Sequence, residues 1–66
     1  MKGVDIMLKY LGEIDCIGDL IEIAGEEAAY KAWRGKLNYF KDLSNNSIFG
    51  VGDFEADDIF ENEELI

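Results

Sequence analysis

The chain has 66 residues, a formal net charge of −9 and an apolar fraction of 48%, which predicts a single acidic domain spanning residues 1–66, as a monomer or a homodimer. One cysteine excludes an internal disulfide framework, and the absence of histidine leaves no His/Cys metal site and no histidine base to activate a nucleophile. We therefore expect a protein that is not an enzyme and that binds neither a metal nor a cofactor.

The first third of the chain has helical periodicity. Apolar residues recur at steps of three and four in two runs, one formed by Val4, Met7, Leu8, Leu11 and Ile14 and the other by Ile17, Leu20, Ile21 and Ala24. Gly12 and Gly18 interrupt this pattern and predict a turn near residues 13–18, with Asp15 or Asp19 capping the second helix.

Cys16 lies inside that predicted turn. Free cysteine is among the residue types most often buried, so we expect Cys16 to belong to the core.

The clearest predicted helix covers residues 26–43. Its apolar stripe consists of Tyr30, Trp33, Leu37 and Phe40. Acidic residues at its start, Glu26 and Glu27, and Lys41 near its end have the signs that the helix dipole favours. Gly35 lies within this segment, but the prediction remains one continuous helix.

Aromatic residues in this region have two interpretations, a core seam or an exposed platform for stacking on nucleic-acid bases; they are Tyr30, Trp33, Tyr39 and Phe40. Such platforms accompany a positive groove, and basic residues are confined here to Lys31, Arg34 and Lys36. We expect these three to pair with carboxylates, Lys31 with Glu27 on the same helix. The core interpretation is therefore favoured.

Residues 44–47 form a cluster of turn-forming residues, after which Ile48, Phe49 and Val51 predict a short extended segment that ends at Gly52. One strand alone cannot form a sheet. We expect this segment either to cover the helices as an irregular clip or to pair at its edge with another copy or with a strand of a partner.

A final helix is predicted from Phe54 toward Leu65, with Asp53 as its N-cap. Its apolar side contains Ala56, Ile59 and Phe60, and acidic residues occupy its other sides. The predicted fold class is therefore mainly α, a small domain of three to four short helices with at most one short extended segment near residues 47–51.

Residues 53–64 also match part of a calcium-binding loop. Oxygen ligands occupy positions 1, 3, 5, 9 and 12 of the EF-hand pattern, namely Asp53, Glu55, Asp57, Glu61 and Glu64. The match fails at position 6, where Asp58 replaces the glycine of the sharp turn. A solvated helix face is the favoured interpretation.

The charge is unevenly distributed along the chain. Residues 1–27 carry −5, residues 28–52 carry +3, and residues 53–66 carry −7 with no lysine or arginine. This balance disfavours DNA and anionic membranes as direct ligands and favours a basic protein surface. No apolar run is long enough to span a bilayer and the N-terminus lacks a signal-peptide pattern, so we expect a cytoplasmic protein.

Carboxylates at helical spacing are the candidate binding residues. Side chains three or four residues apart on a helix lie about 5–6 Å from each other, which is of the same order as the phosphate spacing along a nucleic-acid strand. The candidates in the last block are Asp53, Glu55, Asp57, Asp58, Glu61, Glu63 and Glu64, and those in the first block are Asp15, Asp19, Glu22 and Glu26.

In size, charge and lack of catalytic residues the whole chain resembles the small acidic inhibitors of phages and mobile elements, the anti-CRISPR and anti-restriction proteins that act as DNA mimics. This resemblance carries no diagnostic motif. It implies a partner that is a nucleic-acid-binding host defence complex, occupied at its basic DNA-contacting surface in the cytoplasm of the host cell.

Two alternatives remain open. The first is an antitoxin-like or adaptor protein that binds one basic partner through the acidic, apolar C-terminal segment. In that case Ile48, Phe49, Ile59 and Phe60 should dominate the affinity. The second is a small domain whose acidic surface is solvated and serves solubility alone.

Overall fold

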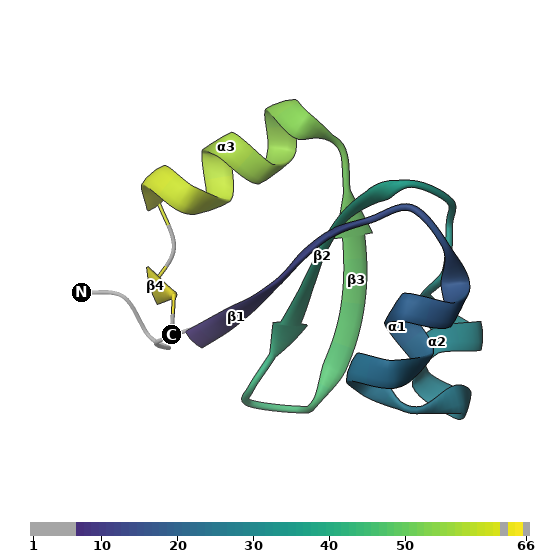
Figure 1. Cartoon of the computed structure of the whole chain (residues 1–66). Coiled ribbons are helices and arrows are strands. Elements are labelled where there is room, and N and C mark those ends of the chain that lie inside the picture. The colour runs from purple at the N-terminus through teal and green to yellow at the C-terminus, as the bar shows by residue number, and fades with distance from the viewer. Residues whose placement is uncertain (1–6, 63, 66) are drawn as a thin grey trace.

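The structure is a computed structural model that describes residues 7–62 and the backbone of residues 64–65, and it is an α+β domain (Figure 1). The elements in chain order are β1 (Met7–Ile14), α1 (Ile17–Ala24), α2 (Glu26–Ala32), β2 (Leu37–Asp42), β3 (Ser47–Val51), α3 (Asp53–Asn62) and β4 (Glu64–Leu65). The strand order is β3-β2-β1-β4, with β1, β2 and β3 antiparallel and the short β4 parallel to β1. The prediction of a mainly α fold is therefore wrong.

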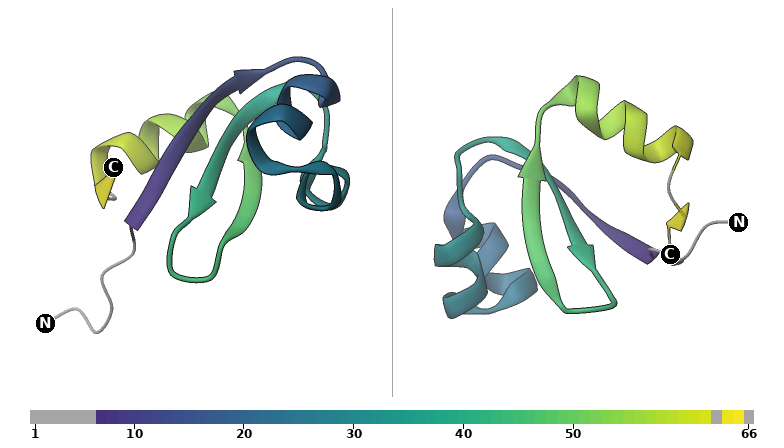
Figure 2. Two further views of the ribbon diagram at one scale, coloured as in Figure 1. Left: turned by 60° about the horizontal axis from the view of Figure 1, so that its bottom comes forward. Right: turned by 180° about the vertical axis from the view of Figure 1, so that it is seen from behind.

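The central strand β2 is buried on both faces. Asn38, Tyr39 and Phe40 are consecutive and all buried, as expected for a strand that is covered on both sides. Tyr39 belongs to the cluster that α1 and α2 form with the sheet, whereas Phe40 belongs to a second cluster with Ala56 of α3. The helices thus cover opposite faces of the sheet, and the views in Figure 2 show α3 apart from α1 and α2.

The predicted helix over residues 26–43 is divided into α2 and β2. Trp33 already has extended backbone angles, and Gly35 has a positive φ of 102°, which favours glycine. The Tyr39 hydroxyl fixes this connection, because it accepts a hydrogen bond from the Arg34 backbone N–H at 2.9 Å and donates one to the Gly35 carbonyl at 2.8 Å. The stripe from Tyr30 to Phe40 therefore combines a residue of α2, a residue of the connection and residues on both faces of β2.

The aromatic core prediction holds for part of its set. Tyr39 and Phe40 are fully buried, and Trp33 stacks on Tyr39 with ring centroids 5.6 Å apart. Tyr30 is 63% exposed, so its assignment to the core is wrong. The Arg34 guanidinium donates to the carbonyls of Lys31 and Trp33 at the end of α2, where we had expected a carboxylate partner.

A bulge in β1 explains why this strand reads as a helix in the sequence. Tyr10 pairs with Phe40 and Gly12 pairs with Tyr39, so Leu11 is an extra residue. The extra residue reverses which face the following side chains point to, since Leu8 packs in the α3 cluster and Ile14 in the α1–α2 cluster. Alternation with one added residue produces steps of three and four, which imitate helical periodicity.

The second predicted helix of this region is confirmed as α1, with Leu20 fully buried. Its N-cap is Cys16, which makes no side-chain capping hydrogen bond, so neither Asp15 nor Asp19 has the capping role that we expected. Cys16 is exposed, and its predicted place in the core is wrong. It lies in the connection between β1 and α1, outside both hydrophobic clusters.

The predicted turn and extended segment are confirmed, but their surroundings differ from the prediction. Two side chains organise the turn: Asp42 accepts from the backbone and hydroxyl of Ser44, and Asn45 accepts from those of Ser47. The extended segment is β3, which pairs with β2 of the same chain. The expectation of an unpaired clip is therefore wrong.

The final helix is confirmed as α3, with Ala56 buried and Ile59 packed against the sheet. The Gly52 carbonyl accepts from the Ala56 backbone N–H at 2.9 Å, so Gly52 precedes the first turn and Asp53 lies within it rather than at the N-cap. A helical backbone over Asp53–Asn62 is incompatible with a calcium loop at these residues. Glu63 lies outside the described residues, as do the side chains of Glu64 and Leu65.

Candidate protein-binding surface

Apolar contacts with the sheet determine which side of α3 faces solvent. Ala56 and Ile59 pack in the cluster that contains Leu8 and Phe40. Phe60 contacts Tyr10 edge-on, with ring centroids 5.0 Å apart, and is 5.7 Å from the Phe40 ring. These contacts cover one side of α3, so its remaining sides face solvent.

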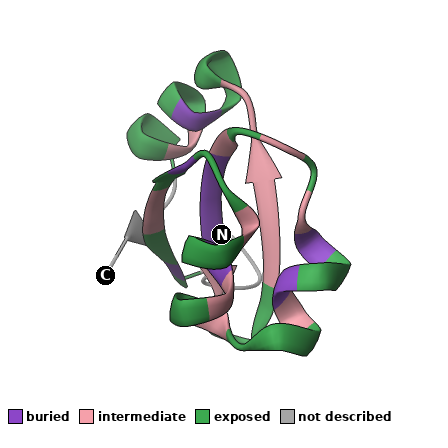
Figure 3. Cartoon of the chain, turned by 45° about the vertical axis from the view of Figure 1, so that its right-hand side comes forward, coloured by how far each residue is buried: buried purple, intermediate pink, exposed green. Residues whose placement is uncertain are grey.

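Five carboxylates occupy the exposed sides of α3, and we call them the α3 acidic surface: Asp53, Glu55, Asp57, Asp58 and Glu61. All five are exposed, and most of the α3 ribbon in Figure 3 has the green colour of exposed residues. Their spacings of three and four residues place neighbouring carboxylates about 5–6 Å apart. No basic residue lies between positions 53 and 62 to neutralise them.

Two of these carboxylates accept hydrogen bonds from asparagine side chains. The Asn38 amide donates to Asp53 at 2.9 Å, and the Asn62 amide donates to Asp58 at 2.9 Å. Asn38 also accepts from the Tyr10 hydroxyl at 2.8 Å, so a chain of side-chain hydrogen bonds joins β1, β2 and the start of α3. This chain aligns the first turn of α3 with the sheet.

Tyr10 is close to this negative surface, and the pKa of its hydroxyl is affected by it. Loss of solvation raises the pKa of the Tyr10 hydroxyl above 10.0, and the charges of Glu13 and Asp53 raise this pKa further. A neutral Tyr10 keeps the donor that the hydrogen bond to Asn38 requires.

Candidates from the first block lie on the other helices. Asp15 precedes α1, Asp19 and Glu22 belong to α1, and Glu26 begins α2, and all four are exposed. Because α1 and α2 cover the face of the sheet opposite to α3, the two acidic blocks do not form one continuous helical face (Figures 1 and 2). Sequence order alone does not reveal this separation.

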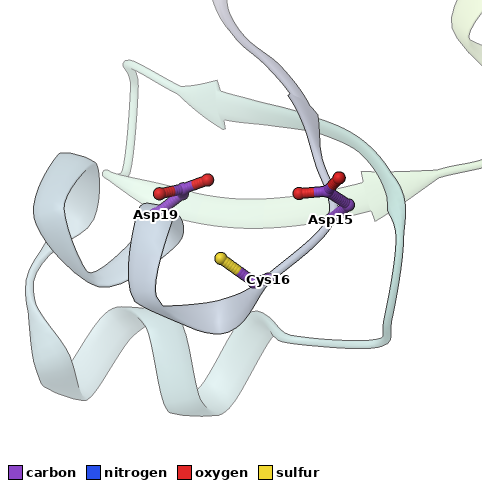
Figure 4. Close-up of side chains that lie close together, drawn as sticks. All are labelled: Asp15, Cys16 and Asp19. Carbon is purple, nitrogen blue, oxygen red and sulfur yellow. The ribbon is translucent and has the colours of Figure 1, made fainter.

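Within the first block three potential ligand groups converge. Asp15, Cys16 and Asp19 place one oxygen or sulfur atom each within 4.8 Å of one another (Figure 4). All three side chains are exposed, and groups of this kind are common on acidic proteins that bind no ion. We therefore do not assign a metal site to this cluster.

An open hollow of about 370 Å³ lies between α2 and the start of β3. Its lining consists of Glu27, Ala28, Lys31, Ala32, Asn45, Asn46, Ser47 and Ile48. The Ser47 hydroxyl donates to Asn45, and the chain contains no histidine that would act as its base. The hollow therefore lacks the nucleophile and histidine pair of a hydrolase.

Phe54 is a surface residue that the sequence interpretation missed. It is 93% exposed, far more than any other large apolar side chain that the structure describes. The signal was present in the helical spacing, because a residue two positions before Ala56 points to the opposite side of a helix. Phe54 thus stands among the carboxylates of the α3 acidic surface.

No protein-family model matches the chain, and neither the curated proteins nor the solved structures contain a significant match. Among the described residues, no helix is long and apolar enough to cross a membrane. The function must therefore be inferred from the surface itself.

Proposed function

We propose that this protein is an inhibitor that binds, through the α3 acidic surface, the basic nucleic-acid-binding surface of a host defence complex of the anti-CRISPR or anti-restriction target type. The proposed partner surface is rich in lysine and arginine. The inhibitor acts by occupancy: while it covers that surface, nucleic acid cannot bind.

The observation that carries this proposal is the concentration of exposed carboxylates on a helix that packs against the sheet. Five exposed carboxylates lie on a helix that Ala56, Ile59 and Phe60 hold against the sheet. A surface that is ordered before binding loses little conformational entropy in the complex. Concentrated negative charge also accelerates association with a basic partner and makes this association sensitive to salt.

The test is the variant Glu55→Lys/Asp57→Lys/Glu61→Lys, which leaves unchanged the two α3 carboxylates that accept hydrogen bonds from asparagine, Asp53 and Asp58. The control, Glu13→Lys/Glu22→Lys/Glu27→Lys, reverses three exposed carboxylates of the first block. Each triple variant changes the net charge from −9 to −3, because every reversal adds two positive units. Circular dichroism and thermal melting verify that both variants remain folded.

The measurement is a pull-down from cells that carry CRISPR and restriction systems, with mass spectrometry of the bound proteins and competition by duplex DNA at two salt concentrations. We expect the wild type and the control to retain a nucleic-acid-binding complex that DNA and salt both release, and the α3 variant to lose at least about tenfold in affinity, equivalent to 1.4 kcal/mol. Equal retention by the folded α3 variant would contradict the proposal.

Phe54 favours a second candidate function, an antitoxin-like or adaptor protein that binds a single basic partner. Exposed aromatic side chains are frequent energetic centres of protein interfaces. The sequence predicted that Ile48, Phe49, Ile59 and Phe60 would dominate the affinity for such a partner. All four contact the domain's own core or aromatic cluster. Phe54 is therefore the apolar residue of α3 that is free to anchor a partner.

Phe54→Ala separates the two functions without disturbing the fold, because the side chain is 93% exposed. For the DNA-mimic inhibitor we expect this variant to bind within about threefold of the wild type, since charge dominates that interface. A loss of about 2 kcal/mol or more, together with recovery of one small partner that DNA does not release, would favour the antitoxin or adaptor function.

A further inference from the structure

Strand β3 leaves one edge of the sheet open. It is the last strand in the order β3-β2-β1-β4, and within the described residues it pairs only with β2 (Figures 1 and 2). Ser47–Val51 contains no charged residue and no proline, which are the usual devices that prevent an edge strand from pairing. Apart from the Ser47 N–H, which donates to the Asn45 side chain, the main-chain groups on the outer side of β3 are therefore open to another strand.

We propose that β3 pairs antiparallel with β3 of a second copy of this chain, forming a two-fold symmetric dimer with one continuous sheet. This inference is independent of the proposed function. A domain of 66 residues has a small core, and association of two copies is one way to bury more surface.

The residues of β3 are complementary to themselves around Phe49. In an antiparallel pair centred on that residue, Phe49 lies opposite Phe49 of the second copy, and Ile48 lies opposite Gly50. Phe49 already stacks on Phe40, with ring centroids 5.7 Å apart, so the second copy extends this aromatic row. Ile48 of one copy lies beside Gly50 of the other on the face of α1 and α2, where the Tyr39 ring already fills the space above Gly50.

Repulsion between the two copies of Asp53 does not prevent this pairing despite the net charge of −9. Asp53, the first acidic residue after β3, lies four positions from the symmetry axis. The two copies of Asp53 are therefore separated by about eight strand residues, or roughly 26 Å, which exceeds the Debye length of about 8 Å at physiological ionic strength.

The hollow beside β3 adds contact area for the second copy. Its lining includes Ser47 and Ile48 at the start of β3 together with Ala28 and Ala32 of α2. The proposed register places Val51 of the second copy opposite Ser47, so the residues that follow Val51 reach the mouth of this hollow. An interface of five paired residues is nevertheless small, and we expect weak association.

Sedimentation equilibrium of the whole chain provides the first test. We expect the average mass to rise from 7.5 kDa toward twice this value between roughly 10 µM and 1 mM, the range of weak association. A constant monomer mass over this range would overturn the proposal and would leave the edge to a strand of a different partner.

A disulfide tests the register independently of affinity. In a Cys16→Ser background, the variant Ser47→Cys/Val51→Cys brings unlike positions of the two copies opposite each other, at a Cα separation of about 5 Å that suits a disulfide. Within one chain these positions lie about 13 Å apart, which is too far for a bond. Any disulfide between them therefore joins two copies.

The single variants Ser47→Cys and Val51→Cys are matched controls, because like positions of the two copies are also about 13 Å apart in this register. We expect the double variant to give a covalent dimer under mild oxidation and the single variants to remain largely monomeric on non-reducing gels. No dimer in a double variant that circular dichroism shows to be folded, or equal dimer in the single variants, would overturn the proposal.

Discussion

At the scale of single residues, the absence of a side chain at Gly50 allows the Tyr39 ring to pack directly against the backbone of β3. A Cβ atom built on Gly50 would lie 2.6 Å from Cε1 of the Tyr39 ring, which is closer than carbon atoms approach in proteins. Tyr39 is fully buried and its hydroxyl fixes the connection after α2, so the ring has no alternative position at low cost.

We therefore expect Gly50→Ala to destabilise the fold by about 1–3 kcal/mol, the usual cost of overpacking. The control is Gly18→Ala, since Gly18 lies in α1 with nothing within 4 Å of the added atom. That variant should stabilise the fold by about 0.5 kcal/mol or less, because Gly18 is the second residue of α1 and the cost of glycine in a helix interior, roughly 0.5–1 kcal/mol, applies there only in part. Urea unfolding measures the free energy of unfolding of both variants. Equal stability of the two would show that the space above Gly50 is not required for the packing of Tyr39.

Tyr10 yields a prediction about alkaline pH. Its pKa in the folded protein is raised above 10.0 by loss of solvation and by the charges of Glu13 and Asp53. A raised folded-state pKa means that Tyr10 contributes stability fully below pH 10, and that this contribution is lost as the pH rises through the folded-state pKa.

Absorbance titration of tyrosinate in the wild type and in Tyr10→Phe should assign a transition above pH 10 to Tyr10. Urea unfolding over the same pH range should show a loss of stability in the wild type that the variant lacks. A Tyr10 transition at or below pH 10 would show that its surroundings do not disfavour the phenolate.

At the scale of elements, the attachment of α3 to the sheet depends on one buried polar side chain. Asn38 is 7% exposed and joins the Tyr10 hydroxyl to the Asp53 carboxylate. Removal of this amide leaves both partners without their shared hydrogen bonds, and loss of such bonds to partly buried groups costs about 1–3 kcal/mol.

The expected effect of Asn38→Ala is selective. Hydrogen exchange should accelerate in α3 by a larger factor than in α1 and α2, which pack on the other face of the sheet. Asn62→Ala is the control, because Asn62 is exposed and its removal should change stability by about 0.5 kcal/mol or less. Uniform acceleration throughout the domain would show that Asn38 supports the core rather than α3.

At the scale of the whole molecule, stability should depend on ionic strength. The chain contains 15 acidic and 6 basic residues, and repulsion among the excess carboxylates opposes folding. Salt screens this repulsion, since the Debye length falls from about 30 Å at 0.01 M to about 8 Å at 0.15 M.

We expect Tm to rise by several degrees between these two salt concentrations, because about 1 kcal/mol corresponds to roughly 4–8 °C in a domain of this size. The charge-reversed variant Glu13→Lys/Glu22→Lys/Glu27→Lys, with a net charge of −3, should show a smaller rise. An unchanged or falling Tm in the wild type would mean that favourable charge pairs outweigh the repulsion.

Local signals in the sequence were sufficient for the features that form within a few residues. Turn-forming side chains and helical spacing act on neighbours in the chain. They were sufficient to predict the turn at residues 43–46, helix α1 and the buried side of α3. The exposed acidic residues of α3 were identifiable for the same reason, and Phe54 could have been identified from its spacing relative to Ala56. These features depend on interactions between residues that are close in the chain, so a short stretch of sequence is enough to predict them.

Strand pairing was not encoded in this way, because it joins residues far apart in the chain. The bulge at Leu11 gave β1 a helical spacing, and burial on both faces removed the alternation by which β2 would have been recognised. The exposure of Cys16 and Tyr30 also depends on the tertiary structure, because the packing of the helices on the sheet decides which side chains are covered. The separation of the two acidic blocks has the same origin, since opposite faces exist only once the sheet has formed.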